Sequence, residues 1–340
     1  MKTTKSLFLF SLFIFLFSLL ISCSNGSTDP EPEPPPEPVT TVYTAGYYDN
    51  STTEIACYWK DGAKTDLETV YSHANAIAVV GSDVYVAGWY ENSSGDYIAC
   101  YWKDGAKTDL SVAGSDADAF AIAVVGGVVY VAGQYDNSSN KVACYWKGTA
   151  KTDLYTTNNS RATAIAVVGS DVYTAGFYYD GSDYVSCYWK GTAKTDLYTT
   201  SQSEAYAISV VGSDVYTAGY YWNGTNYVSC YWKGTAKTDL PGTNSEANAI
   251  AVVESDVYIA GWYEGSSIDV ACYWKGTAKT DLSTVDSEAL AIAVSGSDVY
   301  VAGWYYDGSH NAACYWKGAT KTDLYTTAES YANGIVVTVE

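Results

Sequence analysis

The sequence predicts an all-β fold, a seven-bladed β-propeller of four-stranded blades whose first blade is closed by the C-terminal strand. Two observations lead to this prediction. The phrase CYWKDGAKTDL begins at Cys57 and occurs seven times in near-copies, with 42 to 44 residues between successive cysteines. Each copy lies in a unit that reads as four short strands separated by turn residues, and repeats of about 43 residues with four strands are typical of propeller blades.

Residues 1–22 are predicted to be a processing segment. Lys2 and Lys5 precede an apolar run, Leu7 to Ile21, whose 15 residues fall short of the ~20 that span a membrane. The run ends in Leu-Ile-Ser followed by Cys23, which resembles the bacterial lipobox. The resemblance implies a lipoprotein signal peptide, cleavage before Cys23 and acylation of Cys23. An ordinary signal peptide or an uncleaved anchor is the alternative.

Residues 23–38 are predicted to be a stalk between the lipidated cysteine and the propeller, which takes residues 39–340. Six of the seven prolines lie in this segment among acidic residues, and Pro-rich chains adopt extended polyproline II. The formal charge of the whole chain is −20. This charge argues against a nucleic-acid partner and against docking on anionic lipid, because both need clustered basic residues.

One repeat unit, residues 74–110, shows the expected strands in order. Residues 76–80 are apolar and β-branched, and Gly-Ser-Asp then turns the chain into a second strand over residues 84–90. A polar loop leads to a third strand over residues 97–103. An Asp-Gly hairpin turn joins that strand to a fourth over residues 106–110. No helical periodicity follows residue 22.

The two ends of the repeat array predict how the ring closes. The first copy starts at Val42 and lacks the AIAVV strand, whereas the last copy is followed by ANGIVVTV over residues 332–339. The C-terminal segment therefore supplies the strand that the first blade lacks. Closure removes the open sheet edges that would otherwise pair with other chains.

The pattern Ala-Ile-Ala-Val followed by Asp-Val-Tyr-Val-Ala-Gly resembles the tandem β-propeller repeats of bacterial secreted proteins, the SBBP type. The resemblance covers roughly residues 42–340. It implies a propeller fold and says little about activity.

The CYWK strand explains why the phrase recurs. Alternate side chains of a strand point to opposite faces, so Cys57 and Trp59 share one face while Tyr58 and Lys60 share the other. We expect the tryptophans to fill the space between blades. We expect the cysteines to be buried free thiols, because packed sheets lie ~10 Å apart, beyond the ~7 Å between Cα atoms that a disulfide allows.

The sequence offers little for catalysis. His73 and His310 are the only histidines and lie in different repeat contexts, so a positioned base for nucleophilic catalysis is not expected. The Asp of KTDL, first Asp66, recurs in every copy beside a lysine such as Lys64 and is interpreted as structural. The prediction is a protein without enzymatic activity, cofactor or metal.

Aromatic pairs that follow the Ala-Gly of each repeat are the candidate binding residues. Thirteen of these fourteen positions are aromatic, the exception being Gln134, and they run into loops rich in Asp, Asn, Ser and Gly. Such rings could stack on a sugar or anchor a protein. Burial between blades is the structural alternative. The candidate ligand-binding residues are Tyr47, Trp89, Phe177, Tyr220, Trp262 and Trp304.

Together these features predict a monomeric lipoprotein of the bacterial cell envelope, held in the lipid bilayer through acylated Cys23 and placed on the outer membrane. Its expected role is a non-enzymatic binding or adhesion module, with carbohydrate as the ligand at repeated aromatic positions. A protein-interaction scaffold without a small ligand is the first alternative, and a propeller hydrolase or lyase is the second.

Overall fold

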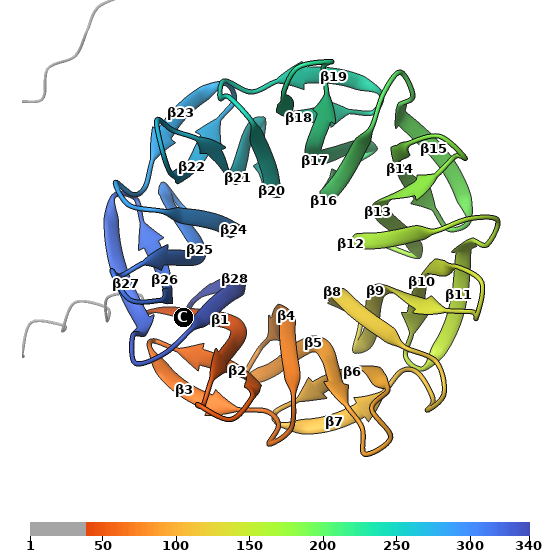
Figure 1. Cartoon of the computed structure of the whole chain (residues 1–340), viewed down its shortest axis with the longest axis horizontal. Coiled ribbons are helices and arrows are strands. Elements are labelled where there is room, and N and C mark those ends of the chain that lie inside the picture. Colours follow the sequence, from red (N-terminus) through yellow and green to blue (C-terminus); the bar gives the residue numbers. More distant parts are fainter. Residues whose placement is uncertain (1–38) are drawn as a thin grey trace, which may run out of the picture. The chain divides into compact units, whose positions relative to one another are not determined.

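The computed structural model describes residues 39–340, which form seven four-stranded antiparallel sheets. The sheets form a ring as the blades of a propeller, and we call the space inside the inner strands the channel (Figure 1). The predicted all-β, seven-bladed architecture is therefore confirmed. No helix in this part of the chain is long and apolar enough to cross a membrane.

Each blade has an inner strand beside the channel, two middle strands and an outer strand at the rim (Figure 1). The inner strands are β28 (Ser330–Val339), β4 (Ser72–Val80), β8 (Ala117–Val125), β12 (Ser160–Val168), β16 (Ser203–Val211), β20 (Ser245–Val253) and β24 (Ser287–Ser295). The second strands are β1 (Thr40–Asp49), β5 (Asp83–Glu91), β9 (Val128–Asp136), β13 (Asp171–Tyr179), β17 (Asp214–Trp222), β21 (Asp256–Glu264) and β25 (Asp298–Tyr306).

The third strands carry the CYWK phrase and the outer strands carry KTD. The third strands are β2 (Glu54–Lys60), β6 (Tyr97–Lys103), β10 (Lys141–Lys147), β14 (Tyr184–Lys190), β18 (Tyr227–Lys233), β22 (Asp269–Lys275) and β26 (Asn311–Lys317). The outer strands are β3 (Ala63–Asp66), β7 (Ala106–Asp109), β11 (Ala150–Tyr155), β15 (Ala193–Tyr198), β19 (Ala236–Asp239), β23 (Ala278–Asp281) and β27 (Thr320–Tyr325).

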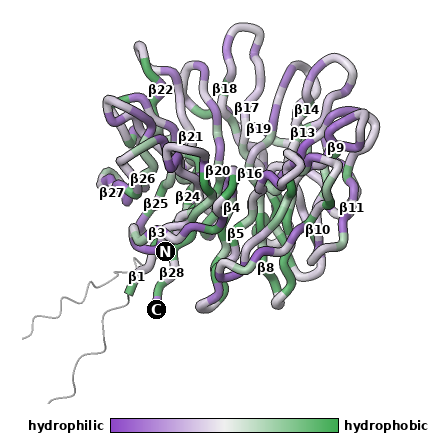
Figure 2. Tube along the Cα trace, turned by 60° about the horizontal axis from the view of Figure 1, so that its bottom comes forward, coloured by the Kyte–Doolittle hydropathy of each residue, from purple (hydrophilic) through white to green (hydrophobic). Residues whose placement is uncertain are grey.

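The ring closes as the ends of the repeat array predicted. Strand β28 pairs antiparallel with β1, with Thr44 opposite Ile335. The backbones of Val39 and Glu340 exchange hydrogen bonds at 3.0 Å, so the C-terminus lies beside the start of β1 (Figure 2). The last strand of the chain therefore completes the first blade.

The repeated tryptophan and cysteine fill the space between neighbouring blades. Trp59 of the first blade is buried together with Cys57, and it packs against Tyr300, Ala302 and Ala313 of the last blade. The small alanines leave room for the indole, and the same arrangement recurs around the ring. The seven ring cysteines are free and buried, as predicted: Cys57, Cys100, Cys144, Cys187, Cys230, Cys272 and Cys314.

The recurring lysines and aspartates are structural, as the sequence indicated for KTDL. The Nζ of Lys64 lies 2.9 Å from Asp66 and 3.2 Å from the ring centre of Tyr48, whose hydroxyl donates to Asp66 at 3.1 Å. The Asp of the Gly-Ser-Asp turn pairs with the lysine of CYWK, as in Lys103 and Asp83 at 2.8 Å. Both carboxylate sets therefore belong to the scaffold.

Three of the four strands predicted for this unit differ in their bounds: β5 is one residue longer at each end, β7 ends at Asp109, and β4 shows the largest difference. The strand expected over residues 76–80 begins at Ser72 instead. The additional residues are Ser-His-Ala-Asn, so they lack the apolar, β-branched pattern on which the prediction relied. In other blades, residues of the same segment line the site described next.

Candidate functional site at the mouth of the channel

Every inner strand contains a β-bulge near its start. In β4, Ala74 lies opposite Gly88 and Ala76 opposite Ala87, so Asn75 has no partner in the ladder. The glycine is required at this point, because a Cβ on Gly88 would lie 1.9 Å from the carbonyl oxygen of His73. This explains the glycine of the recurring Ala-Gly, and bulges of this kind re-aim the side chains around them.

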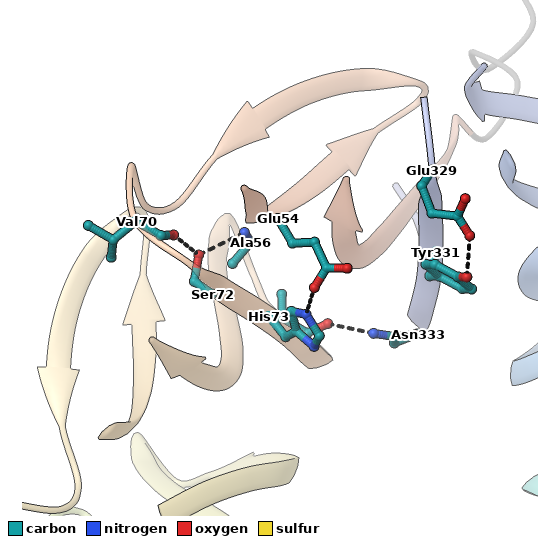
Figure 3. A network of polar contacts seen from close by, with 9 residues as sticks. Glu54, Ala56, Val70, Ser72, His73, Glu329, Tyr331 and Asn333 are labelled. Carbon is teal, nitrogen blue, oxygen red and sulfur yellow. Dashed lines mark hydrogen bonds and ion pairs between the residues drawn. The ribbon is translucent and has the colours of Figure 1, made fainter. Parts of the chain in front are cut away.

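The bulge residue frequently ties one inner strand to the next. The Nδ2 of Asn75 donates to the carbonyl of Ala119 at 2.9 Å, and Asn248 donates to the carbonyl of Ala289 at 3.0 Å. Asn333 repeats the contact across the closure of the ring with the carbonyl of Ala74, also at 3.0 Å (Figure 3). These bonds fix the spacing of the inner strands around the channel.

The position two residues before the bulge residue, which is that of His73 in β4, is not uniform among the repeats. The preceding residue is serine in six of the seven inner strands, and Ser72 accepts from the backbone nitrogen of Ala56 and donates to the carbonyl of Val70 (Figure 3). The next residue varies around the ring, although it is Glu in three blades, and we call this set the mouth ring: Tyr331, His73, Asp118, Arg161, Glu204, Glu246 and Glu288.

A cavity of about 400 Å³ opens at the mouth ring. It is lined by side chains from the inner strands of six blades and from one second strand, so it belongs to the channel and not to a groove between two blades. Its lining residues are Phe120, Arg161, Thr163, Tyr206, Glu246, Asn248, Trp262, Glu288, Leu290 and Asn333. Pockets for small molecules have volumes of about 300–1,000 Å³.

One side of the cavity carries a positioned arginine. The Nε of Arg161 donates to the side-chain oxygen of Gln134 at 3.2 Å, and the amide nitrogen of Gln134 donates to Asp118 at 2.7 Å. The guanidinium lies 4.8 Å from the ring centre of Phe120 and 5.7 Å from that of Phe177. The hydrogen bond and the two rings hold the guanidinium at the lining of the cavity.

Another side of the cavity is acidic. Burial and the neighbouring carboxylates of Glu288, Glu204 and Asp269 raise the pKa of Glu246 to about 7. Burial and the charge of Asp269 likewise raise the pKa of Glu288 to about 7. Both side chains are half-buried, and Trp262 lies opposite Glu246 in the sheet. A cationic group placed here would relieve the repulsion between the carboxylates.

The third side of the mouth ring is filled by aromatic contacts. Tyr47 stacks parallel to His73 with 3.7 Å between ring centres, and His73 also contacts Trp89 at 4.5 Å. The Nε2 of His73 lies 2.6 Å from a carboxylate oxygen of Glu54 (Figure 3). Burial lowers the pKa of His73. These side chains bond and pack with one another, and they lie outside the lining of the cavity.

The six aromatic residues proposed from the sequence lie directly beside the mouth ring. Each is the cross-strand partner of a mouth-ring residue, for example Phe177 opposite Arg161. Only Trp262 lines the cavity. The exposed fractions of Trp89, Phe177, Tyr220 and Trp304 are 8, 7, 5 and 8%, and Tyr47 is half-buried against His73. Five of the six therefore have little ring area to offer a ligand. Cys23 lies outside the described residues.

Sequence reasoning missed the mouth ring, although a signal for it was present. Ser precedes this position in six copies and Ala follows it in all seven, so its five residue types stand out once the copies are aligned. Gln134 and Arg161 were both visible as exceptions in the sequence. Only the fold brings them into contact, because they come from different blades.

Comparison with protein-family models gives no match, and no curated protein matches the sequence. Among solved structures, the ring is similar to TolB from Acinetobacter baumannii, with a TM-score of 0.51 and 8% identity over 87% of this chain and 82% of that one. It is also similar to a Mycobacterium tuberculosis puromycin-hydrolyzing peptidase, with a TM-score of 0.49 and 14% identity over 77% of this chain and 47% of that one.

The Pyrococcus horikoshii acylaminoacyl peptidase is a further similar structure, with a TM-score of 0.45 and 12% identity over 75% of this chain and 46% of that one. The chain spans about half the length of either peptidase. At these identities the likeness concerns the fold alone.

Proposed function

We propose that this chain is a non-enzymatic binding module that takes one compact polar ligand at the mouth of its channel. The observation that carries the proposal is the mouth ring. In a chain that repeats its scaffold seven times, three residues of this variable set, Arg161, Glu246 and Glu288, line one cavity, where they offer opposite charges beside the aromatic face of Trp262. Groups that maintain the scaffold recur in each blade, whereas groups that recognise a single ligand need not.

The proposal replaces several equivalent aromatic sites with one site per chain. Carbohydrate stays a candidate ligand only through Trp262, because the other five predicted aromatic residues do not line the cavity. The N-terminal sequence supports anchoring in the bacterial envelope through acylated Cys23, with the ring carried on the stalk of residues 23–38.

A cavity-filling variant tests this function. Leu290 lines the cavity without a charge, so Leu290→Trp should fill it and leave the charged residues in place. Val112→Trp is the matched control, because Val112 is 79% exposed. The purified full chain would be screened with a glycan array and with small polar compounds by thermal shift, and hits would be measured by calorimetry.

One ligand per chain, with binding lost in Leu290→Trp and kept in Val112→Trp, would support the proposal. Several ligands per chain, or binding that Leu290→Trp leaves unchanged, would contradict it. Either result would favour binding at the aromatic positions that recur in each blade. If the folded protein binds none of these compounds, the result would favour the alternative, a scaffold that binds another protein.

A further inference from the structure

Arg161 is a half-buried cation without an anionic partner, whereas the three lysines of the described residues that form no ion pair, Lys60, Lys141 and Lys147, are exposed. Twelve lysines form ion pairs with Asp or Glu at 4.0 Å or less. Within residues 39–340, Arg161 forms no such pair, although the chain carries a formal charge of −20. A half-buried arginine without an anionic partner, at the lining of a cavity, is available to an anion from solution.

Two side chains of the third blade contact this arginine. Gln134 is the only non-aromatic residue at its position among the seven copies, and it accepts from the Nε of Arg161. Phe120 is the bulge residue of its blade, at a position that is Asn in three of the copies, and its ring centre lies 4.8 Å from the guanidinium carbon. With Nε bonded to Gln134, the Nη groups are left for a ligand. Their planar fork matches a carboxylate.

The acidic side of the cavity also lacks a partner. Among the described residues, no lysine or arginine lies within 4.0 Å of Glu246 or Glu288, although each of these carboxylates is half-buried beside other acids. Trp262 lines the cavity next to them, and tryptophan is the aromatic ring that attracts cations most strongly. The two uncompensated charges, of opposite sign, therefore share one cavity.

We propose that the mouth cavity binds a small zwitterion, with its carboxylate on the guanidinium of Arg161 and its ammonium group at Glu246, Glu288 and Trp262. This inference rests on the proposed function, that the cavity is a ligand site. A ligand with only one charge leaves the other side of the cavity unpaired, and unpaired charges in a half-buried site are costly. A metal ion fits less well, because no group of three or more His, Cys, Asp or Glu in the described residues is placed to hold one.

Unbranched amino acids provide the probes. Calorimetry with the full chain would use a series from glycine to 8-aminooctanoate, in which the separation between the two charges of the ligand increases. It would also compare 6-aminohexanoate with its singly charged analogues, hexanoate and hexylammonium. We expect one zwitterion of the series to bind one per chain and at least tenfold more tightly than the singly charged analogues of its own length. An optimum in chain length would report the separation between Arg161 and the glutamates.

Two charge variants separate the ends of the ligand. Arg161→Gln should weaken the zwitterion and the carboxylate analogue about tenfold and leave the ammonium analogue unchanged. Glu288→Gln should weaken the zwitterion and the ammonium analogue about tenfold and leave the carboxylate analogue unchanged. Glu254→Gln, at an exposed turn beyond the far end of β20, is the control that removes a charge away from the cavity.

The inference is overturned if no zwitterion of the series binds the folded chain, or if Arg161→Gln and Glu254→Gln have the same effect. Those results would leave the proposed function standing as long as Leu290→Trp abolishes binding of some other compound. If Leu290→Trp has no effect on any ligand, the proposed function fails with the inference.

Discussion

The α-carbon of Gly261 lies against the carbonyl oxygen of Glu246: a Cβ at Gly261 would stand 2.0 Å from that oxygen. The same contact recurs in every blade, between the glycine of the second strand and the mouth-ring residue of the inner strand, at 1.8 to 2.0 Å. The repeated scaffold and the variable site therefore meet at this point. The glycine makes room for the bulge, and the bulge sets the direction of the residue that faces the ligand.

Gly261→Ala should accordingly destabilise the ring, because the methyl group and the backbone of β20 cannot both keep their places. We expect a loss of about 2–4 kcal/mol in the free energy of unfolding. Gly276→Ala is the control, since Gly276 has open space around it and only a positive φ of 58°, a strain that costs about 1–2 kcal/mol. Guanidinium denaturation would compare the two, and equal losses would show that the close contact is not the cause.

The ring of the Leu290→Asn variant should be more stable than that of Leu290→Ala. Asn75, Asn248 and Asn333 occupy the equivalent position and donate to the next inner strand, and the corresponding acceptor for residue 290 is the carbonyl of Ala332. One added hydrogen bond is expected to contribute about 0.5–1.5 kcal/mol. The same denaturation experiment on Leu290→Ala gives the loss of the leucine alone. If the asparagine variant is no more stable than the alanine variant, the bond between strands has no net value.

Glu246 and Glu288 should make the stability of the ring fall as the pH rises from about 4.5 to 7, an effect that His73 opposes below about pH 6.5 because burial lowers its pKa in the folded chain. Burial and neighbouring carboxylates raise the pKa of Glu246 and Glu288 from 4.5 to about 7, so the folded chain binds more protons than the unfolded chain in this range. At pH 8, Glu246→Gln or Glu288→Gln should gain about 1–3 kcal/mol and show a flatter decline with pH.

Urea unfolding from pH 4.5 to 8 measures this effect. The groups that face Glu246 are Glu288, Glu204 and Asp269, all acidic, so no nearby cation reverses the sign. Glu254→Gln is exposed and should follow the unmodified chain. A decline that is equally steep in Glu246→Gln, Glu288→Gln and the unmodified chain would place its origin elsewhere.

The ring cysteines should resist alkylation in the folded protein. Burial raises the pKa of thiols such as Cys57 and Cys187 well above the usual value, and the thiolate is the reactive form. With Cys23→Ser in place, iodoacetamide at pH 8 should label none of the seven in native buffer and all seven in guanidinium without a reductant, as counted by mass spectrometry. Rapid native labelling would contradict the burial, and incomplete labelling after unfolding would indicate disulfides.

Periodicity was sufficient to predict the fold, the blade number and the closing strand. Repeated residues such as Trp59 and Cys57 report the packing that each blade needs, and that packing recurs because the geometry recurs. The same logic predicted that Asp66 belongs to the scaffold, since a residue present in every blade serves every blade.

Only part of the candidate site could be predicted from the repeats. The aromatic residues were selected as the most prominent repeated feature, and they lie in the correct part of the ring, opposite the mouth-ring residues in the sheet. Their burial could not be seen, because it depends on the bulge and on the neighbouring blade. The contact between Gln134 and Arg161 joins residues of different blades, which no pattern within one repeat contains.

The pairing of β28 with β1 also determines which way the ring faces. Tyr331, near the start of β28, belongs to the mouth ring, whereas Val339 at the other end of the strand pairs with Thr40. The eight residue steps between them span about 26 Å of extended strand. The chain thus enters the ring at one pole and presents its cavity at the other. The first described residue, Val39, therefore lies at the pole opposite the mouth ring, and a ligand reaches the cavity from the side of the ring away from Val39.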